Sequence, residues 1–233
     1  MRERKNQKDM TAADWSTFID AVNQTHGVGA KAPAYRDFVA VHARAMNMAD
    51  PVGMSWGVHS MGPMMHGRNF LAWHRWFVLQ MENRLRKVHA SITIPYWNAI
   101  EDRAIPAALD KASLLASWSV TRHWNPSILA TQTDLDAAKA MGTFTAFQKT
   151  LEGAVHASVH DAVGGTMAGA SSPADPLFFL HHANIDRLWA EWQTTHASQG
   201  PPNPTEILQP KPILGVAVSK VLSIQKLGYG YSG

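Results

Sequence analysis

Twelve histidines occur in this chain, and six of them form two sets whose spacing suits metal binding. One set is His42, His66 and His74, and the other is His156, His160 and His182. Neutral imidazole nitrogens are ligands for copper, zinc, nickel and iron, so two sets of three predict two metal ions. A single buried histidine is more often a hydrogen-bonded core residue. Six together favour metal binding, because each unpaired imidazole would cost roughly 1 to 3 kcal/mol.

Composition limits the other chemistry that the chain could perform. It has 233 residues, of which 45% are apolar and none is cysteine. Without thiolates, disulfides and iron-sulfur clusters are excluded, and any metal must be held by histidine or carboxylate side chains. Since no Pro/Gly/Ser-rich linker divides the chain near its middle, we expect residues 1–233 to form a single domain.

The charge pattern predicts neither a nucleic-acid partner nor a membrane. The formal net charge is +3, and the densest basic cluster, residues 1–8, is interrupted by Glu3 and lacks aromatic residues for base stacking. The sequence contains no run of about 18 apolar residues. Because its start is too polar for a signal peptide, we expect a cytoplasmic protein, with export on a partner protein as the alternative.

Apolar periodicity places the first set of histidines on helices. A helix over residues 12–24, starting at Thr11, carries no chemistry, but a helix over 34–47 puts His42 on its apolar stripe. Asn69 can cap a third helix, in which His74 also lies on the inward face. Three charged residues of that helix are expected to lie away from this face: Arg75, Glu82 and Arg84.

The second set of histidines follows the same logic. A helix over residues 153–162, ended by Gly164 and Gly165, stacks His156 and His160 on one side as a two-point clamp. The next helix opens at 175–176 and turns His182 inward, with His181 about a quarter-turn away, where it either supports the ligands or packs in the core. A strand is expected at 213–218. The fold class is therefore mainly α, a four-helix bundle with long loops and little β structure around a metal centre.

Several assignments near this centre have alternatives. His59 precedes His66 by one short loop and competes with it as a ligand. Glu152 lies one turn before His156, where we expect a role near the metals, and Phe178 is both a core residue and a candidate for lining the pocket over them. The remaining histidines are expected to be structural: His26, His89, His123 and His196.

These residues resemble the type-3 copper proteins, in particular compact bacterial tyrosinases and the related catechol oxidases. The resemblance runs from about Arg4 to Tyr231, nearly the whole chain. Its most specific segments are FLAWHR at 70–75, PYW at 95–97, LEG at 151–153, HASVH at 156–160, GGTM at 164–167 and DPLFFLHHANIDRLW at 175–189. The resemblance implies a four-helix bundle around two copper ions, with the first bound by His42, His66 and His74 and the second by His156, His160 and His182. It also implies a cation-π contact between Arg4 and Tyr229.

The chain departs from the family pattern at several positions. The interval from His66 to His74 is one residue shorter than usual, which keeps His59 open. Ala157 stands where related tyrosinases have an asparagine that, together with the glutamate matching Glu152, holds a water that deprotonates monophenols. Asp161 would place a negative charge at the rim of the substrate pocket. The sequence also ends just after the tyrosine motif, so we expect no C-terminal shielding domain.

The resemblance implies a phenol oxidase that uses O2 to hydroxylate monophenols at the ortho position and to oxidise o-diphenols to o-quinones. Because Ala157 offers no amide, we expect diphenol oxidation to be the stronger activity. An o-aminophenol oxidase of the same family and a non-catalytic oxygen-binding copper protein are the alternatives. A dinuclear zinc hydrolase is disfavoured, since Ala157 cannot act as the glutamate base of its helical motif. The implied partners are small phenols, O2 and a copper-loading or export protein.

Overall fold

The chain folds into a mainly helical structure, as predicted. The computed structural model describes residues 1–27, 29–60 and 67–232. Its α-helices are α1 (Ala12–His26), α2 (Tyr35–Ala45), α3 (Pro51–Ser55), α4 (Phe70–Leu85), α5 (Ala112–Trp118), α6 (Gln132–Lys139), α7 (Phe144–Thr150), α8 (Ala157–Val163) and α9 (Leu177–Thr195). A π-helical turn, η3 (Leu151–His156), joins α7 to α8. The short 3-10 turns are η1 (Gln7–Asp9), η2 (Pro126–Ile128), η4 (Gly165–Ala168), η5 (Ser172–Ala174) and η6 (Val218–Lys220), and the strands are β1 (Arg2–Arg4) and β2 (Tyr229–Tyr231).

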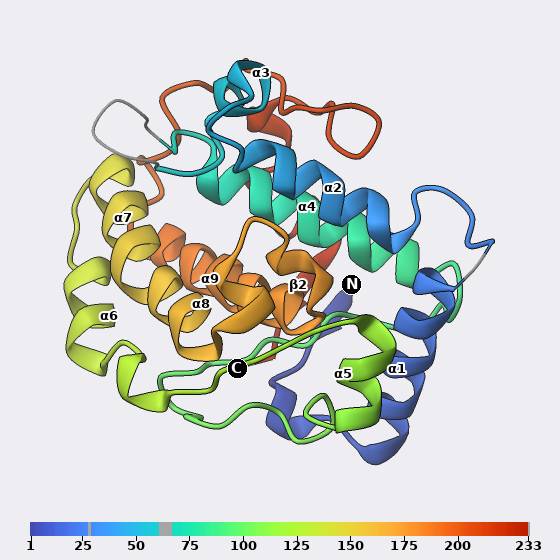
Figure 1. Cartoon of the computed structure of the whole chain (residues 1–233). Coiled ribbons are helices and arrows are strands. Elements are labelled where there is room, and N and C mark those ends of the chain that lie inside the picture. Colours follow the sequence, from blue (N-terminus) through green and yellow to red (C-terminus); the bar gives the residue numbers. More distant parts are fainter. Residues whose placement is uncertain (28, 61–66, 233) are drawn as a thin grey trace.

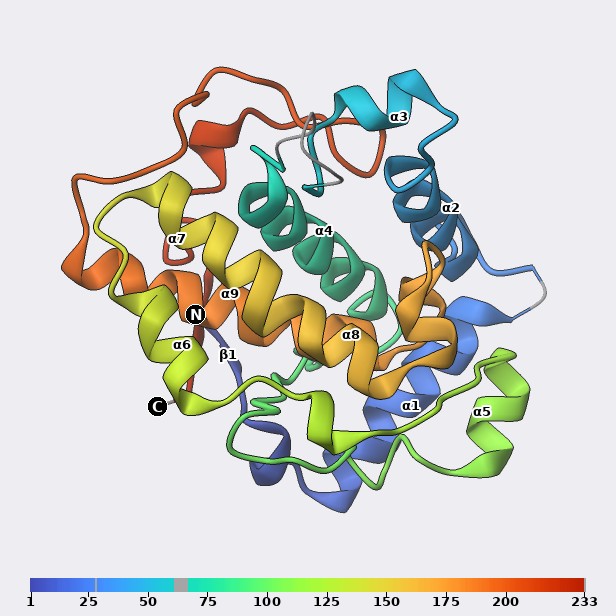
Figure 2. The same ribbon diagram turned by 60° about the vertical axis from the view of Figure 1, so that its left-hand side comes forward.

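Four helical segments form the bundle that carries the histidines. Helix α4 packs against α9, the η3–α8 segment lies against α9, and α2 lies beside α4 (Figures 1 and 2). Aromatic rings fill the centre: the ring of Phe77 on α4 lies 5.4 Å from that of Phe38 on α2 and 6.1 Å from that of Phe178 on α9. None of the helices in the described ranges is long and apolar enough to cross a membrane.

The two helices predicted near the N-terminus are confirmed, with small shifts at their ends. Thr11 and Asp14 form the capping box of α1, which continues to His26. Helix α2 is shorter than the predicted 34–47, and the Asp37 carboxylate caps it by accepting a hydrogen bond from the backbone N–H of Ala34 at 2.7 Å. Local side-chain hydrogen bonds therefore fix both helix starts.

Asn69 occupies the N-cap position of α4, but its side chain does not cap the helix. The Asn69 amide instead donates to the carbonyl of Trp56 at 2.8 Å and to Glu206 Oε1 at 2.8 Å. The expected capping bond is therefore absent, and Asn69 ties the start of α4 to the segment that follows α3.

The three charged residues expected to lie away from the His74 face of α4 are buried: Arg75, Glu82 and Arg84. Strand β1 pairs in parallel with β2 and covers this face of α4, with Arg2 opposite Tyr229. Arg4 on β1 pairs with Glu82 at 2.8 Å. The Arg4 guanidinium carbon also lies 3.8 Å from the centre of the Tyr229 ring, which confirms the predicted cation-π contact.

The expectation of a strand at 213–218 is wrong. This segment makes a single isolated bridge, between Ile207 and Ala217. Gly215 has a φ of +95°, which interrupts any extended run. The strand of the C-terminal region is instead β2, whose partner lies more than 200 residues earlier in the chain.

His26 gives the folded chain a pH-dependent stability. Its ring stacks on Tyr35 with 3.7 Å between ring centroids, and burial lowers its pKa to about 4. A histidine with a lowered pKa binds its proton less tightly when folded, so stability is greatest above the unfolded pKa of ~6.5 and falls as pH drops toward 4. The free energy of unfolding of the parent should fall between pH 7 and pH 4. We expect that of His26→Phe to fall by about 1 to 2 kcal/mol less, a figure reduced because the ring is partly exposed. Urea unfolding at both pH values checks this, and equal losses in the two proteins would contradict it.

Candidate metal centre

Three buried histidines from different segments come together to form the first group. His42 lies on α2, His59 follows α3, and His74 lies on α4. One ligand atom from each lies within 4.8 Å of the others. His66, the expected third member, lies outside the described residues, and His59 occupies the place beside His42 and His74.

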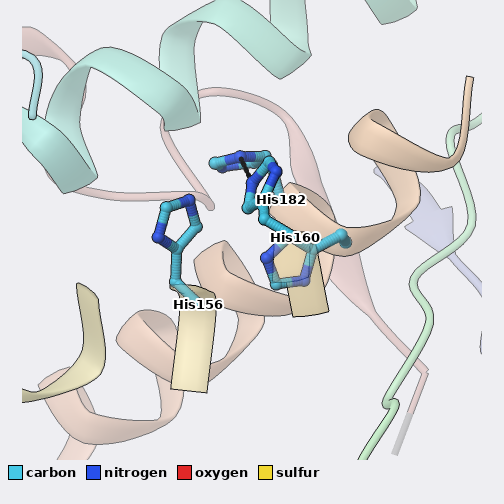
Figure 3. A group of neighbouring side chains, drawn as sticks. His156, His160 and His182 are labelled. Carbon is cyan, nitrogen blue, oxygen red and sulfur yellow. Dashed lines mark hydrogen bonds between the residues drawn. The ribbon is translucent and has the colours of Figure 1, made fainter. Parts of the chain in front are cut away.

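A second group lies beside the first, on the η3–α8 segment and α9. His156 ends η3, His160 lies on α8, and His181 and His182 lie on α9, with one ligand atom from each within 4.8 Å of the others. The rings of His156, His160 and His182 are turned toward one another (Figure 3). His181 is also buried, with its ring 5.4 Å from that of His156, and one of its ring nitrogens lies within the same group.

The two groups adjoin and form one centre. The rings of His74 and His182 stack with 4.1 Å between centroids, and those of His59 and His156 stack at 5.7 Å. Helices α4 and α9 thus bring the two groups into contact. A pair of metal ions bound here would be neighbours.

Backbone carbonyls set the orientation of four rings. In each ring the Nδ1 atom lies within hydrogen-bond distance of a backbone carbonyl oxygen. The distances are 2.7 Å from His42 to Ala170, 2.9 Å from His74 to Phe70, 3.2 Å from His156 to Glu152 and 2.7 Å from His160 to Met167. Because a carbonyl only accepts, each Nδ1 must carry the proton. Each Nε2 is then left with a free lone pair directed into the centre.

The arrangement of these lone pairs suits the binding of a metal ion. Nε2 of His42 faces Nε2 of His59 at 3.3 Å, and Nε2 of His160 faces Nε2 of His182 at 3.4 Å. Where both nitrogens are acceptors, such a contact is not a hydrogen bond. Nε2 of His74 and of His156 are buried and have no partner among the described residues. A cation between these atoms would satisfy all of them.

The charge state of the rings also suits metal binding. Burial lowers the pKa of His42, His74, His156 and His182 well below that of a free imidazole, and it lowers the pKa of His160 to about 4. The neighbouring imidazoles add to this shift in several of these residues. The rings are therefore neutral near pH 7, as a ligand must be.

A cavity of about 130 Å³ opens beside the histidines. Its lining includes His42, His59, His156 and His160, together with Ala157 and Asp161. Phe178 is not among the lining residues, since its ring packs behind the centre, 4.1 Å from the ring of His182. Ala157 and Asp161 thus line the cavity beside the histidines, whereas the ring of Phe178 packs against His182.

Glu152 lies at the centre, as expected, but it contacts a residue that sequence reasoning did not select. Its Oε1 accepts from the backbone N–H of Ser60 at 2.7 Å, and its Oε2 accepts from the Ser60 hydroxyl at 2.9 Å. The predicted helix over 153–162 in fact begins as the π-helical turn η3, which holds both Glu152 and His156. The only sequence signal for Ser60 was its position after the competing ligand His59.

Comparison with known proteins places the chain in a family. The model for the common central domain of tyrosinase matches residues 32–135 and 110–195. The tyrosinase of Streptomyces antibioticus is 31% identical, over 85% of each chain. Two solved structures share the fold over the whole of this chain. One is an octopus hemocyanin functional unit, with a TM-score of 0.75, 22% identity and 68% of that chain covered. The other is a polyphenol oxidase of Thermothelomyces thermophila, with a TM-score of 0.76, 17% identity and 89% of that chain covered. The chain therefore belongs to the tyrosinase family and is a type-3 copper phenol oxidase whose cofactor is a pair of copper ions.

Proposed function

We propose that the chain oxidises small phenols with dioxygen, and that it favours o-diphenols over monophenols. His42, His59 and His74 would hold one copper, and the other would be held by His156, His160 and His182. The observation that carries this proposal is the convergence of Nε2 atoms, 3.3 Å apart for His42 and His59 and 3.4 Å apart for His160 and His182, with the Nδ1 atoms of His42 and His160 held by backbone carbonyls. When bound, the copper pair supplies the electron transfer between phenol and dioxygen.

The reaction balances without a further reductant. Two o-diphenols each lose two electrons and two protons, and one dioxygen takes these up to give two o-quinones and two waters. With a monophenol, one oxygen atom enters the ring, the other leaves as water, and the product is again an o-quinone. The protein's part is to bind the ring in the cavity, keep the ligands neutral and accept the phenolic proton.

Metal analysis and turnover test the proposal together. We expect two coppers per chain after reconstitution, and steady o-quinone formation from catechol with matching oxygen uptake. A non-catalytic oxygen-binding protein would bind two coppers without turnover, and a faster rate with o-aminophenol than with catechol would favour the aminophenol oxidase. Fewer than two coppers would refute the dinuclear centre.

The contacts of Glu152 support the expected diphenol preference. Both carboxylate oxygens already accept hydrogen bonds from Ser60, and Ala157 in the cavity wall offers no amide. A water beside them would be held by few contacts and would be a weak base for a phenol proton.

Restoring an amide at residue 157 should therefore raise monophenol hydroxylation. We expect Ala157→Asn to increase the ratio of monophenol to diphenol kcat/KM by about tenfold, equivalent to ~1.4 kcal/mol. Ala157→Val, which adds bulk without an amide, is the control. If the ratio for Ala157→Asn stayed at the parent value under matched assays, this account of the alanine would be wrong.

Asp161 should select substrates by charge. It is exposed at the cavity that Ala157 and His160 also line, and a carboxylate about 4 Å from a substrate charge contributes ~1 kcal/mol in water. We expect tyramine to be preferred to a phenolic acid, and Asp161→Asn to reduce this preference about fivefold. Raising the salt concentration should reduce the preference of the parent and leave the variant nearly unaffected. A preference that survives the substitution would assign the selectivity to another group.

A further inference from the structure

We infer that Glu152 is a positioning residue that orients one histidine in each metal group, and that Ser60 fixes it in place. Its side chain would orient His59, and its main chain would orient His156. This inference rests on the proposed function, in which both histidines are copper ligands. It assigns to Glu152 a role in holding the metals that is separate from any role with the phenolic proton.

The side chain of Glu152 faces His59. Glu152 is buried, with 7% of its surface exposed, and its Oε1 lies 3.5 Å from His59 Nδ1. A carboxylate favours the tautomer that carries its proton on Nδ1. Nε2 of His59 is then left free to face Nε2 of His42 at 3.3 Å.

Ser60 fixes this carboxylate through both of its oxygens. The backbone N–H and the hydroxyl of Ser60 donate to Glu152 at 2.7 and 2.9 Å, and the Ser60 hydroxyl accepts from the backbone N–H of Gly67 at 3.0 Å. A Cβ atom at Gly67 would lie 2.9 Å from Glu152 Oε2, closer than real contacts allow. Glycine at 67 is therefore what permits this close approach.

The main chain of Glu152 serves the other metal group. Its carbonyl oxygen lies 3.2 Å from His156 Nδ1, at the opposite end of the turn η3. The rings of His59 and His156 stack nearly parallel, at an angle of 28°. Single π-helical turns often occur at functional sites, and here the turn directs one residue toward a histidine of each group.

Three variants separate positioning from proton handling. Substitution of a residue that orients a ligand typically lowers metal affinity 10- to 100-fold. We expect Ser60→Ala to weaken the binding of one of the two coppers by about tenfold, and Glu152→Ala by up to about a hundredfold. Glu152→Gln should bind both coppers nearly as the parent does, since its amide oxygen accepts from the Ser60 N–H and its NH2 group can donate to the Ser60 hydroxyl.

Copper retention is measured by titrating the holoenzyme with a copper chelator, with Ser117→Ala on α5 as the exposed-serine control. Equal retention by the parent, Ser60→Ala and Glu152→Ala would overturn the inference. So would a result in which Glu152→Gln and Glu152→Ala lose monophenol hydroxylation alike while copper binding is unchanged, since that pattern belongs to proton handling alone. If Glu152→Ala does not fold, the comparison of Ser60→Ala with Glu152→Gln decides. A parent protein that fails to bind two coppers would instead refute the proposed function.

Discussion

Replacing His182 with alanine is expected to reduce the copper content from two per chain to one and to abolish catechol oxidation. The Nε2 atom of His182 faces that of His160 at 3.4 Å, and its ring stacks on His74 of the other group. Without His182 the chain would hold one copper and lack the second metal that the two-electron oxidation of a diphenol would need. The rate should therefore fall by about a thousandfold or more, corresponding to ~4 kcal/mol of lost transition-state stabilisation. Atomic absorption and oxygen uptake measure the two effects.

The adjacent histidine provides the matched comparison for this variant. His181 is buried beside His156, but its two ring nitrogens have no hydrogen-bond partner among the described residues. His181→Phe keeps a planar ring in that space and should retain two coppers. His123→Ala, on an exposed loop residue, should behave as the parent. If His181→Phe lost one copper and His182→Ala kept both, His181 and not His182 would be the ligand.

The second large effect concerns stability, and its centre is Asp186. One carboxylate oxygen pairs with Arg75, and the other accepts hydrogen bonds from the hydroxyls of Tyr229 and Tyr231, both at 2.6 Å, and lies 3.3 Å from Arg4. Asp186→Ala leaves two buried guanidinium groups short of a partner. We expect it to destabilise the fold by about 3 to 5 kcal/mol and to lower Tm by on the order of 10 °C.

Thermal and urea unfolding measure this loss, with Asp136→Ala on the exposed face of α6 as the control. Burial alone would raise the pKa of Asp186, but Arg75 and Arg4 outweigh it and the pKa is lowered. Its stabilising effect is therefore complete at neutral pH and is lost as pH falls through the lowered value. A change below about 1 kcal/mol in Asp186→Ala would show that this cluster contributes little.

Helices and inward-facing histidines could be predicted because periodicity reports them directly. His42, His74 and His182 each share a stripe with large apolar residues, and all three are buried in the structure. The cation-π contact of Arg4 with Tyr229 came from family resemblance, not from periodicity, because its partners are 225 residues apart.

The features that the sequence did not predict depend on contacts between segments far apart in the chain, which the spacing of residues does not encode. Glu82 is buried because Arg2 and Arg4 of β1 pair with it. Arg75 is buried because it pairs with Asp186 on α9 and donates to the carbonyl of Leu222. The place of His59 beside His42 depends on how the segment after α3 returns to the bundle. A π-helical turn has no sequence pattern that distinguishes it from an α-helix, so η3 was predicted as α-helix.

The pairing of β1 with β2 has a consequence for biosynthesis. Residues 2–4 are synthesised before the bundle helices, but their partners at 229–231 are synthesised after them. Until residues 229–231 are made, Asp186 lacks the two tyrosine hydroxyls that donate to it, and Arg4 lacks the ring of Tyr229. We therefore expect a nascent chain stalled before Tyr229 to be less stable and more open to proteases than the completed fold.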